Sequence, residues 1–475
     1  MARIYYERLS DESAGYLEAE TSRRRTHTAM ILVFEAGPLA TEGGGVDFPR
    51  IREVVARRLG ELPRLRCKLR RVPLDGHPVW VDDREFNLDH HLRHSSLPRP
   101  GNALQLARTA ARITATPLDR SRPLWDCWVL EGLEGGRFAM ILKMHKALAS
   151  LEGADLLRAI LSESGERDDT KGRVRFTPRP APSPVELFLK EVVQGWSPSR
   201  RAVARGVRLV TQPGRAGREL RNRGREVLQV LGYKLRHASE SPFDGHLGPH
   251  RAFSLQPIDL DVIQQLRRTL GGTVHDGVLT LFTGALRRYV QARRVSPANV
   301  DLRAVTPVLE GDGREARSWV VELPVWEERL VDRHELVCEQ TRKIRAHSDV
   351  ASADVLSAGS EWNASRLFVI GARALKTIET GQIAVLQSPG PRAPLYLDGA
   401  PLVECYGILP LRDSSGLGAS IIGYCGRLFF ALNADPDLVG DLERLRESLE
   451  EEARAILEEV AAQGPMLRAV GGGGD

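Results

Sequence analysis

The sequence predicts two α/β or α+β domains joined by a linker. A length of 475 residues is too long for one ordinary hydrophobic core. Strand-like apolar runs alternate with helical patterns in both halves of the chain. Residues 171–245 are rich in proline, glycine and arginine, which is typical of an extended connector. We therefore expect domains at 1–170 and 246–475.

Each half contains segments with clear strand or helix patterns. The apolar runs Thr28–Glu35 and Phe138–Met144 are predicted strands, and Phe48–Leu62 has helical periodicity. Asp259–Gly272 has an acidic first turn and a glycine stop, which is typical of a helix. Asp435 and Pro436 are suited to begin one last helix. Its apolar stripe would consist of Leu438, Leu442, Leu445, Leu449, Ile456 and Val460.

The linker has two features that favour a lipid partner. Val185–Trp196 is a predicted amphipathic helix with these apolar residues at helical spacing: Val185, Phe188, Leu189, Val192 and Trp196. Residues 200–237 then carry eleven arginines and lysines against two glutamates. Such a segment can lie on an anionic lipid surface. The alternative is a helix packed on a domain with its arginines in water, and nucleic acid is disfavoured because the basic block lacks interleaved aromatic residues.

Cysteine usage and hydropathy limit the class of protein. The five cysteines have no CxxC spacing, which favours reduced thiols over a disulfide framework or a zinc site. The N-terminal segment carries charges throughout and lacks the apolar core of a signal peptide. No run reaches the roughly 18 apolar residues that a membrane span needs. We therefore expect a cytoplasmic protein, peripheral to a membrane or lipid droplet, that binds no metal.

Segments spread over almost the whole chain match one protein family in order and spacing. They are Leu9–Thr21, Pro63–Asp83, Leu97–Gly101, Pro117–His145, Gly271–Val290, Ser388–Glu404 and Gly426–Val439. The strongest is Pro117–His145, and the Pro-Leu-Trp sequence within it is specific. On these segments the chain resembles the bacterial wax ester synthase/acyl-CoA:diacylglycerol acyltransferase family.

The resemblance implies a fold, substrates and site residues. The fold is α/β, with two domains of the chloramphenicol acetyltransferase type and a channel between them. Family members transfer an acyl group from acyl-CoA to a long-chain alcohol or to diacylglycerol, giving wax ester or triacylglycerol, without a cofactor. The resemblance also leaves a homodimer open. It implies substrate contacts at Pro123, Leu124, Trp125, Ser388 and Gly390.

The family's catalytic segment is altered in this chain. A hydroxyl must lose its proton as it attacks a thioester carbonyl, and a neutral imidazole is the suitable base. The family supplies this base as the second histidine of an HHxxxDG motif, in which the aspartate helps to hold the loop. Here His145 is present, but Lys146 stands at the base position, Ser150 at the aspartate and Leu151 at the glycine.

Three residues are candidates for the missing base. Lys146 would have to be neutral, which costs about 4.6 kcal/mol at pH 7; the alternative is a solvated cation that lines the channel. In a strand, His145 would face away from Lys146, which favours a structural histidine under the loop. His275, followed by Asp276, stands where the family has Asn-Asp at the domain interface. It is either a relocated base or a histidine at the start of a helix.

Two function hypotheses follow from the altered motif. The first is an O-acyltransferase with weakened or altered catalysis. The second is a non-catalytic paralogue that binds acyl-CoA or lipid, or that partners an active acyltransferase.

Overall fold

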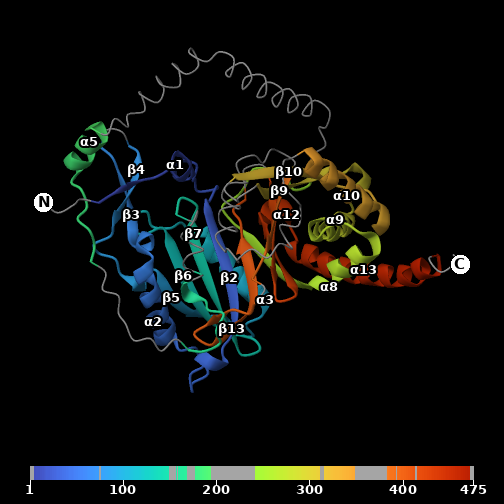
Figure 1. Cartoon of the computed structure of the whole chain (residues 1–475), viewed down its shortest axis with the longest axis horizontal. Coiled ribbons are helices and arrows are strands. Elements are labelled where there is room, and N and C mark those ends of the chain that lie inside the picture. Colours follow the sequence, from blue (N-terminus) through green and yellow to red (C-terminus); the bar gives the residue numbers. More distant parts are fainter. Residues whose placement is uncertain are drawn as a thin grey trace, which may run out of the picture.

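Two mixed β-sheets organise the chain (Figure 1). The computed structural model describes residues 5–73, 76–148, 157, 159–167, 177–193, 241–310, 315–347, 382–391, 393–411 and 415–470. The first sheet has the strand order β12-β13-β2-β7-β6-β5, and the second has the order β10-β9-β11-β14-β15-β8. Both contain parallel and antiparallel pairs.

The first sheet is built mainly from the N-terminal half. Its strands are β2 (His27–Glu35), β5 (Leu92–Ser96), β6 (Trp125–Leu133), β7 (Arg137–His145), β12 (Tyr396–Leu397) and β13 (Ala400–Ile408). The helices of this half are α1 (Asp11–Glu18), α2 (Phe48–Arg58) and α3 (Ala103–Ala115). Nearly every side chain of β2 and β7 is buried, because both faces of the sheet are covered. β2 and β7 pair antiparallel, with His27 opposite His145.

A smaller sheet lies at the edge of this half. It consists of β1 (Glu7–Arg8), β4 (Pro78–Asp82) and β3 (Cys67–Arg71), in that order. Helix α5 (Pro184–Val193) packs on it through Leu187, which is buried with Val72, Val79 and Val81. α5 falls within the predicted linker helix, whose last residues lie outside the described part, as does the basic block 200–237.

The second sheet and its helices come from the C-terminal half. Its strands are β8 (Ala252–Asp259), β9 (Leu302–Glu310), β10 (Glu315–Leu323), β11 (Gln382–Pro389), β14 (Leu417–Tyr424) and β15 (Arg427–Ala434). The helices are α8 (Leu260–Leu270), α9 (Val274–Ala292), α10 (Leu330–His347), α12 (Pro436–Val439) and α13 (Leu442–Val470). Helix α9 is buried because α8, α10 and α13 pack around it (Figure 1).

Two expectations from the sequence need correction. Strands β12 and β13 belong to the first sheet, although 246–475 was expected to form a separate domain; in Figure 1 the orange β13 lies beside the blue β2. The division of the chain at its linker therefore does not coincide with the division into sheets. The predicted last helix is two helices, because Gly440, with φ 71°, separates α12 from α13. Asp435 caps only the short α12.

Candidate active site

His145 is the last residue of β7, and both of its ring nitrogens are engaged within the protein. Nδ1 accepts a hydrogen bond from the backbone N–H of Ala147 at 3.0 Å. Nε2 lies 2.7 Å from Oγ1 of Thr26 and 3.6 Å from Oε2 of Glu20. Because Nδ1 is an acceptor, the neutral ring carries its proton on Nε2. Both ring nitrogens of His145 are therefore occupied by contacts within the protein, which favours a structural role.

The buried carboxylate of Glu20 contacts several side chains at this end of β7. Glu20 accepts a hydrogen bond of 2.7 Å from Arg120, and its Oε1 lies 3.1 Å from Nε2 of His27. Burial alone would raise the pKa of Glu20, but the hydrogen bond from Arg120 and the nearby rings of His145 and His27 hold it well below its usual range. Burial lowers the pKa of His27 to about 4, against the pull of Glu20. The pKa of His145 is also lowered by burial, so both rings are neutral at pH 7.

Lys146 is not the solvated cation that the sequence allowed. Only 4% of the residue is exposed, and its Nζ lies 5.3 Å from the centre of the Tyr16 ring. A lysine within about 6 Å of an aromatic face is attracted to it as a cation. The backbone N–H of Lys146 donates to the carbonyl of Thr26 at 2.9 Å, which continues the β2–β7 pairing by one residue. Ser150 and Leu151 lie outside the described residues.

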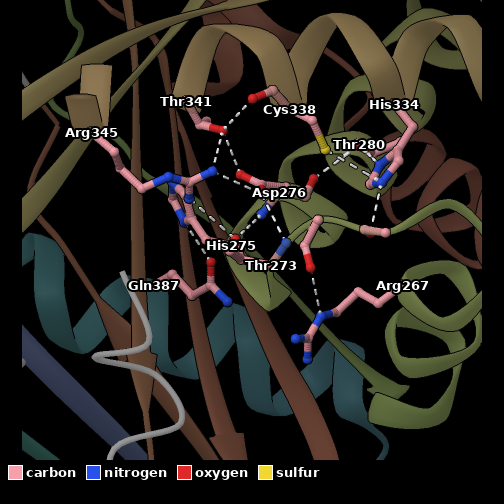
Figure 2. Close-up of polar contacts among 12 residues, drawn as sticks. Arg267, Thr273, His275, Asp276, Thr280, His334, Cys338, Thr341, Arg345 and Gln387 are labelled. Carbon is pink, nitrogen blue, oxygen red and sulfur yellow. Dashed lines mark hydrogen bonds and ion pairs between the residues drawn. The ribbon is translucent and has the colours of Figure 1, made fainter. Parts of the chain in front are cut away.

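His275 lies in the first turn of α9, in the C-terminal half, as expected for a histidine at the start of a helix. Nδ1 donates to Oε1 of Gln387, on β11, at 2.8 Å (Figure 2). The proton therefore sits on Nδ1, and Nε2 keeps its lone pair. Nε2 is enclosed and has no hydrogen-bond partner among the described residues. Burial lowers the pKa of His275, so the ring is neutral.

The Asp276 side chain stabilises the start of helix α9. It forms a capping box with Thr273, whose N–H donates to Oδ2 at 2.8 Å. Thr341 donates to Oδ1 at 2.7 Å, and Arg345 lies 3.2 Å from Oδ2 (Figure 2). Burial would raise the pKa of Asp276, but these partners lower it. The Asp276 side chain thus has a structural role.

A second buried histidine, His334, lies close to Asp276 and was not expected from the sequence. Its Nδ1 lies 2.9 Å from Oγ1 of Thr280, and its Nε2 lies 3.4 Å from Sγ of Cys338. A side chain at Gly272, which has φ 82°, would lie 2.8 Å from that sulfur. The turn before α9 therefore requires glycine here. Burial raises the pKa of the Cys338 thiol to about 11, so the group is a thiol at neutral pH.

The five residues expected to contact substrate have different surroundings. Pro123 lines a cavity of about 410 Å³. Leu124 and Trp125 are fully buried, and the Trp125 indole donates to the carbonyl of Leu65 at 2.7 Å. These two residues pack in the core, and the expectation that they contact substrate stays a prediction.

The other two of these residues, Ser388 and Gly390, lie in the C-terminal half, at the end of β11. Ser388 is buried and donates to the carbonyl of Pro389 at 3.2 Å. A Cβ at Gly390 would lie 1.7 Å from the carbonyl oxygen of Gly423, so glycine is required for β11 to approach β14. Sequence reasoning missed Glu20, His27, Arg120 and Gln387. Glu20 lies within a matched segment, but only the folding of the segment after α1 brings it to His145.

None of the helices that the structure describes is both long enough and apolar enough to cross a lipid bilayer.

Comparisons with known proteins agree with this architecture. The family model described as the wax ester synthase/diacylglycerol acyltransferase catalytic domain matches residues 9–278, and that of the WS/DGAT C-terminal domain matches 322–457. One Mycobacterium tuberculosis relative is 30% identical, covering 94% of this chain and 98% of its own length. Another is 28% identical, covering 95% and 90%. Both are named "Putative diacyglycerol O-acyltransferase".

Two solved structures share the fold. The wax ester synthase/diacylglycerol acyltransferase from Marinobacter aquaeolei VT8 has a TM-score of 0.68 at 19% identity, covering 96% of this chain and 100% of that chain. The first condensation domain of the calcium-dependent antibiotic synthetase has a TM-score of 0.53 at 15% identity, covering 96% of each chain. The expected two-domain α/β fold is thereby confirmed.

Proposed function

Because the chain belongs to the wax ester synthase/diacylglycerol acyltransferase family, we propose that it is an O-acyltransferase with weakened or altered catalysis. Its substrates would be acyl-CoA and a hydrophobic acceptor, either a long-chain alcohol or diacylglycerol. One observation carries the proposal. At the end of β7, Lys146 replaces the base and is buried against Tyr16, while His145 has both ring nitrogens engaged.

The reaction explains why this observation matters. The acceptor oxygen attacks the thioester carbonyl carbon, the C–S bond breaks, and the hydroxyl proton finally resides on the CoA thiol. A positioned base that removes this proton contributes about 10²–10⁴-fold to the rate. A lysine ammonium has no lone pair for the task. The Nε2 proton of His145 points toward Thr26 and Glu20, and its only lone pair, on Nδ1, accepts from Ala147.

The direct test measures CoA release from palmitoyl-CoA with hexadecanol or dioleoylglycerol as acceptor. The Marinobacter aquaeolei protein, assayed in parallel, provides the reference. We expect this chain to be slower by about 10²–10⁴-fold while still binding palmitoyl-CoA in calorimetry. A rate equal to the reference would contradict the proposal. Binding without detectable turnover with either acceptor would instead support the non-catalytic acyl-CoA-binding paralogue.

We further propose that the protein associates with an anionic lipid surface through residues 185–237. The support comes from α5. Leu187 anchors this helix on the small sheet, while Val185 and Leu189 are 66% and 54% exposed. The anchoring residue was not part of the predicted apolar stripe, and two members of that stripe face outward. An exposed apolar pair ahead of a basic segment is suited to an interface.

Vesicle sedimentation tests this association. The protein should bind phosphatidylserine-containing vesicles, and salt should weaken the binding because charges are screened over about 8 Å at physiological ionic strength. The double variant Val185→Ser/Leu189→Ser should bind less. Val320→Ser, at another exposed apolar residue (44% exposed), is the matched control. Equal binding by the double variant and the control would rule out α5 as a contact.

A further inference from the structure

Two cavities adjoin along α3. The first, of about 410 Å³, lies between the C-terminal part of α3 and strands β5, β6 and β7. The second, of about 640 Å³, lies between α3, β8 and the start of α13. Thr109 and Arg112 line both cavities, which are therefore adjacent, and we call the two together the α3 groove. Both volumes fall in the range of about 300–1,000 Å³ that is usual for small-molecule sites.

One end of the α3 groove is cationic. Arg93, Arg112, Arg122 and Lys143 line the first cavity, against the acids Asp119 and Asp126. Lys143 is 1% exposed and donates to the carbonyls of Ile113 at 2.9 Å and Thr116 at 2.8 Å. The nearest carboxylate oxygen, on Asp126, is 3.8 Å from its Nζ. Burial lowers the pKa of Lys143 to about 8, and a bound anion would oppose this effect.

The acids of the α3 groove already have partners. Asp119 accepts from Ser121 and lies 3.5 Å from Arg122. Glu443, in the second cavity, pairs with Arg446. At the positive end, four cationic side chains face two acids, so part of the positive charge is not neutralised there.

Two arginines at the middle of the groove strengthen this conclusion. Arg108 and Arg112 are both exposed and lie one helical turn apart on α3. Like charges at this spacing destabilise a helix by a few tenths of a kcal/mol. Neither guanidinium has an ion pair or hydrogen bond to any residue within the described ranges. An anionic group placed between them would relieve the repulsion and accept their hydrogen bonds.

The second cavity offers apolar surface beside Arg108, Arg112, Arg251 and Glu443. Leu104 of α3 is 39% exposed there, and Phe253 of β8 and Leu442 of α13 also contribute to the lining. Pro98, Ala111 and Ala252 extend this surface. The second cavity thus places apolar side chains next to cationic ones, and the first cavity continues the cationic lining.

We propose that the α3 groove binds a single-chain anionic lipid, with its acidic head group at Arg108, Arg112 and the cationic end, and its alkyl chain along Leu104, Phe253 and Leu442. This inference goes beyond the proposed acyl transfer, because none of these residues belongs to the altered catalytic motif. The head group that the arginines recognise is a carboxylate or a phosphate. A fatty acid carries the first and a lysophosphatidate the second, and the experiment separates them.

Calorimetric titration of the full-length protein tests the proposal, with oleate and 1-oleoyl-lysophosphatidate below their micellar concentrations. Monooleoylglycerol supplies the chain without the charge, and inorganic phosphate supplies the charge without the chain. We expect at least one of the two anionic lipids to bind. Monooleoylglycerol and inorganic phosphate should each bind at least about tenfold more weakly than that lipid. The tighter of the two lipids identifies the head group.

Matched variants locate the site. Arg108→Glu/Arg112→Glu should weaken lipid binding at least about tenfold, and Leu104→Asn should weaken it less. Arg454→Glu, at an exposed arginine of α13, should leave binding unchanged. Palmitoyl-CoA binding should be the same in the double variant and the unmodified protein, which keeps this test separate from the proposed acyl transfer.

The proposal is overturned if neither lipid binds, or if monooleoylglycerol binds as tightly as the anionic lipids. It is also overturned if the double arginine variant retains full affinity, or if it loses palmitoyl-CoA binding in parallel. Thermal melting of each variant shows whether it is folded. A double variant that is unfolded is replaced by Arg112→Gln, for which the same weakening is expected and full affinity would again overturn the proposal.

Discussion

The end of β7 and the start of α9 each hold a buried histidine, and the two rings have opposite tautomers. At β7, the N–H of Ala147 occupies Nδ1 of His145, so the proton lies on Nε2. At α9, Gln387 accepts from Nδ1 of His275, so the lone pair lies on Nε2, where it is enclosed. The neighbours, and not the residue type, decide which nitrogen could act as a base. As the described residues surround them, neither ring offers an accessible basic nitrogen.

The carboxylates of the two regions differ in a related way. Glu20 has cationic or neutral partners from β2, β7 and the loop before β6, which are separate in the sequence. Asp276 caps its own helix, and it also contacts Thr341 and Arg345 of α10. We therefore expect the β7 region to control pH dependence and the α9 region to control stability.

The largest effect should come from restoring the motif at β7. The variant Lys146→His/Ser150→Asp/Leu151→Gly should raise CoA release with palmitoyl-CoA by about 10²–10⁴-fold, because it supplies a positioned imidazole. Lys146→Gln is the control, since it removes the lysine without supplying a base, and it should give no gain. If Lys146→Gln instead abolishes turnover in the unmodified background, lysine is the base and the altered motif is functional.

The next effect concerns the α9 region. Asp276→Ala should lower the free energy of unfolding by about 3–5 kcal/mol, because it leaves Arg345 without its buried partner and removes the helix cap. Urea denaturation monitored by circular dichroism measures the change. Asp261→Ala, in the exposed first turn of α8, is the control and should change stability by no more than about 0.5 kcal/mol. A loss below about 1 kcal/mol for Asp276→Ala would show that its contacts are dispensable.

A smaller effect should appear when the pH is lowered. The folded pKa of His27, about 4, lies below the ordinary value near 6.5. As the pH falls, His27 is therefore protonated in the unfolded chain before it is protonated in the folded protein. Stability is therefore lost as the pH falls from about 6.5 toward 4. Between pH 7 and 5 this amounts to about 2 kcal/mol, which should be absent from His27→Gln.

The shift in the pKa of Glu20 affects the pH dependence of stability in a different pH range. Its folded pKa is depressed, so its contribution is present above about pH 4.3 and is lost only below that value. The interval from pH 7 to 5 thus separates the buried histidines from Glu20, and the difference between the unmodified protein and His27→Gln isolates His27. Urea titrations of both proteins at the two pH values make the comparison, and parallel losses would mean that His27 is solvated in the folded state.

The smallest effect should come from the enclosed histidine. His275→Phe/Gln387→Leu replaces both hydrogen-bonding partners by apolar groups, which is nearly neutral when shape is kept. We expect a change in unfolding free energy within about 1 kcal/mol and a change in CoA release within about twofold. His145→Phe is the contrast, because it leaves the N–H of Ala147 and the Glu20 cluster without their partner and should cost more than about 2 kcal/mol. A large loss of CoA release in the double variant would identify His275 as a relocated base.

Local signals in the sequence determined the elements and the altered motif. Apolar runs predicted β2 and β7, the acidic start and glycine stop predicted α8, and the matched segments identified the family. That Lys146 stands at the base position follows from the resemblance to the family and stays a prediction. These features depend on neighbours a few residues apart, which is why periodicity and capping reveal them.

Only the tertiary structure decided the contacts between distant segments. The pairing of His27 with His145, the insertion of β13 beside β2, and the approach of Gln387 to His275 all join residues far apart in the chain. Strand register and the burial of Lys146 against Tyr16 depend on how the sheets and helices pack, and no periodic pattern encodes a partner on another strand. The tautomer of each histidine, and with it the chemistry open to this site, was set at that level.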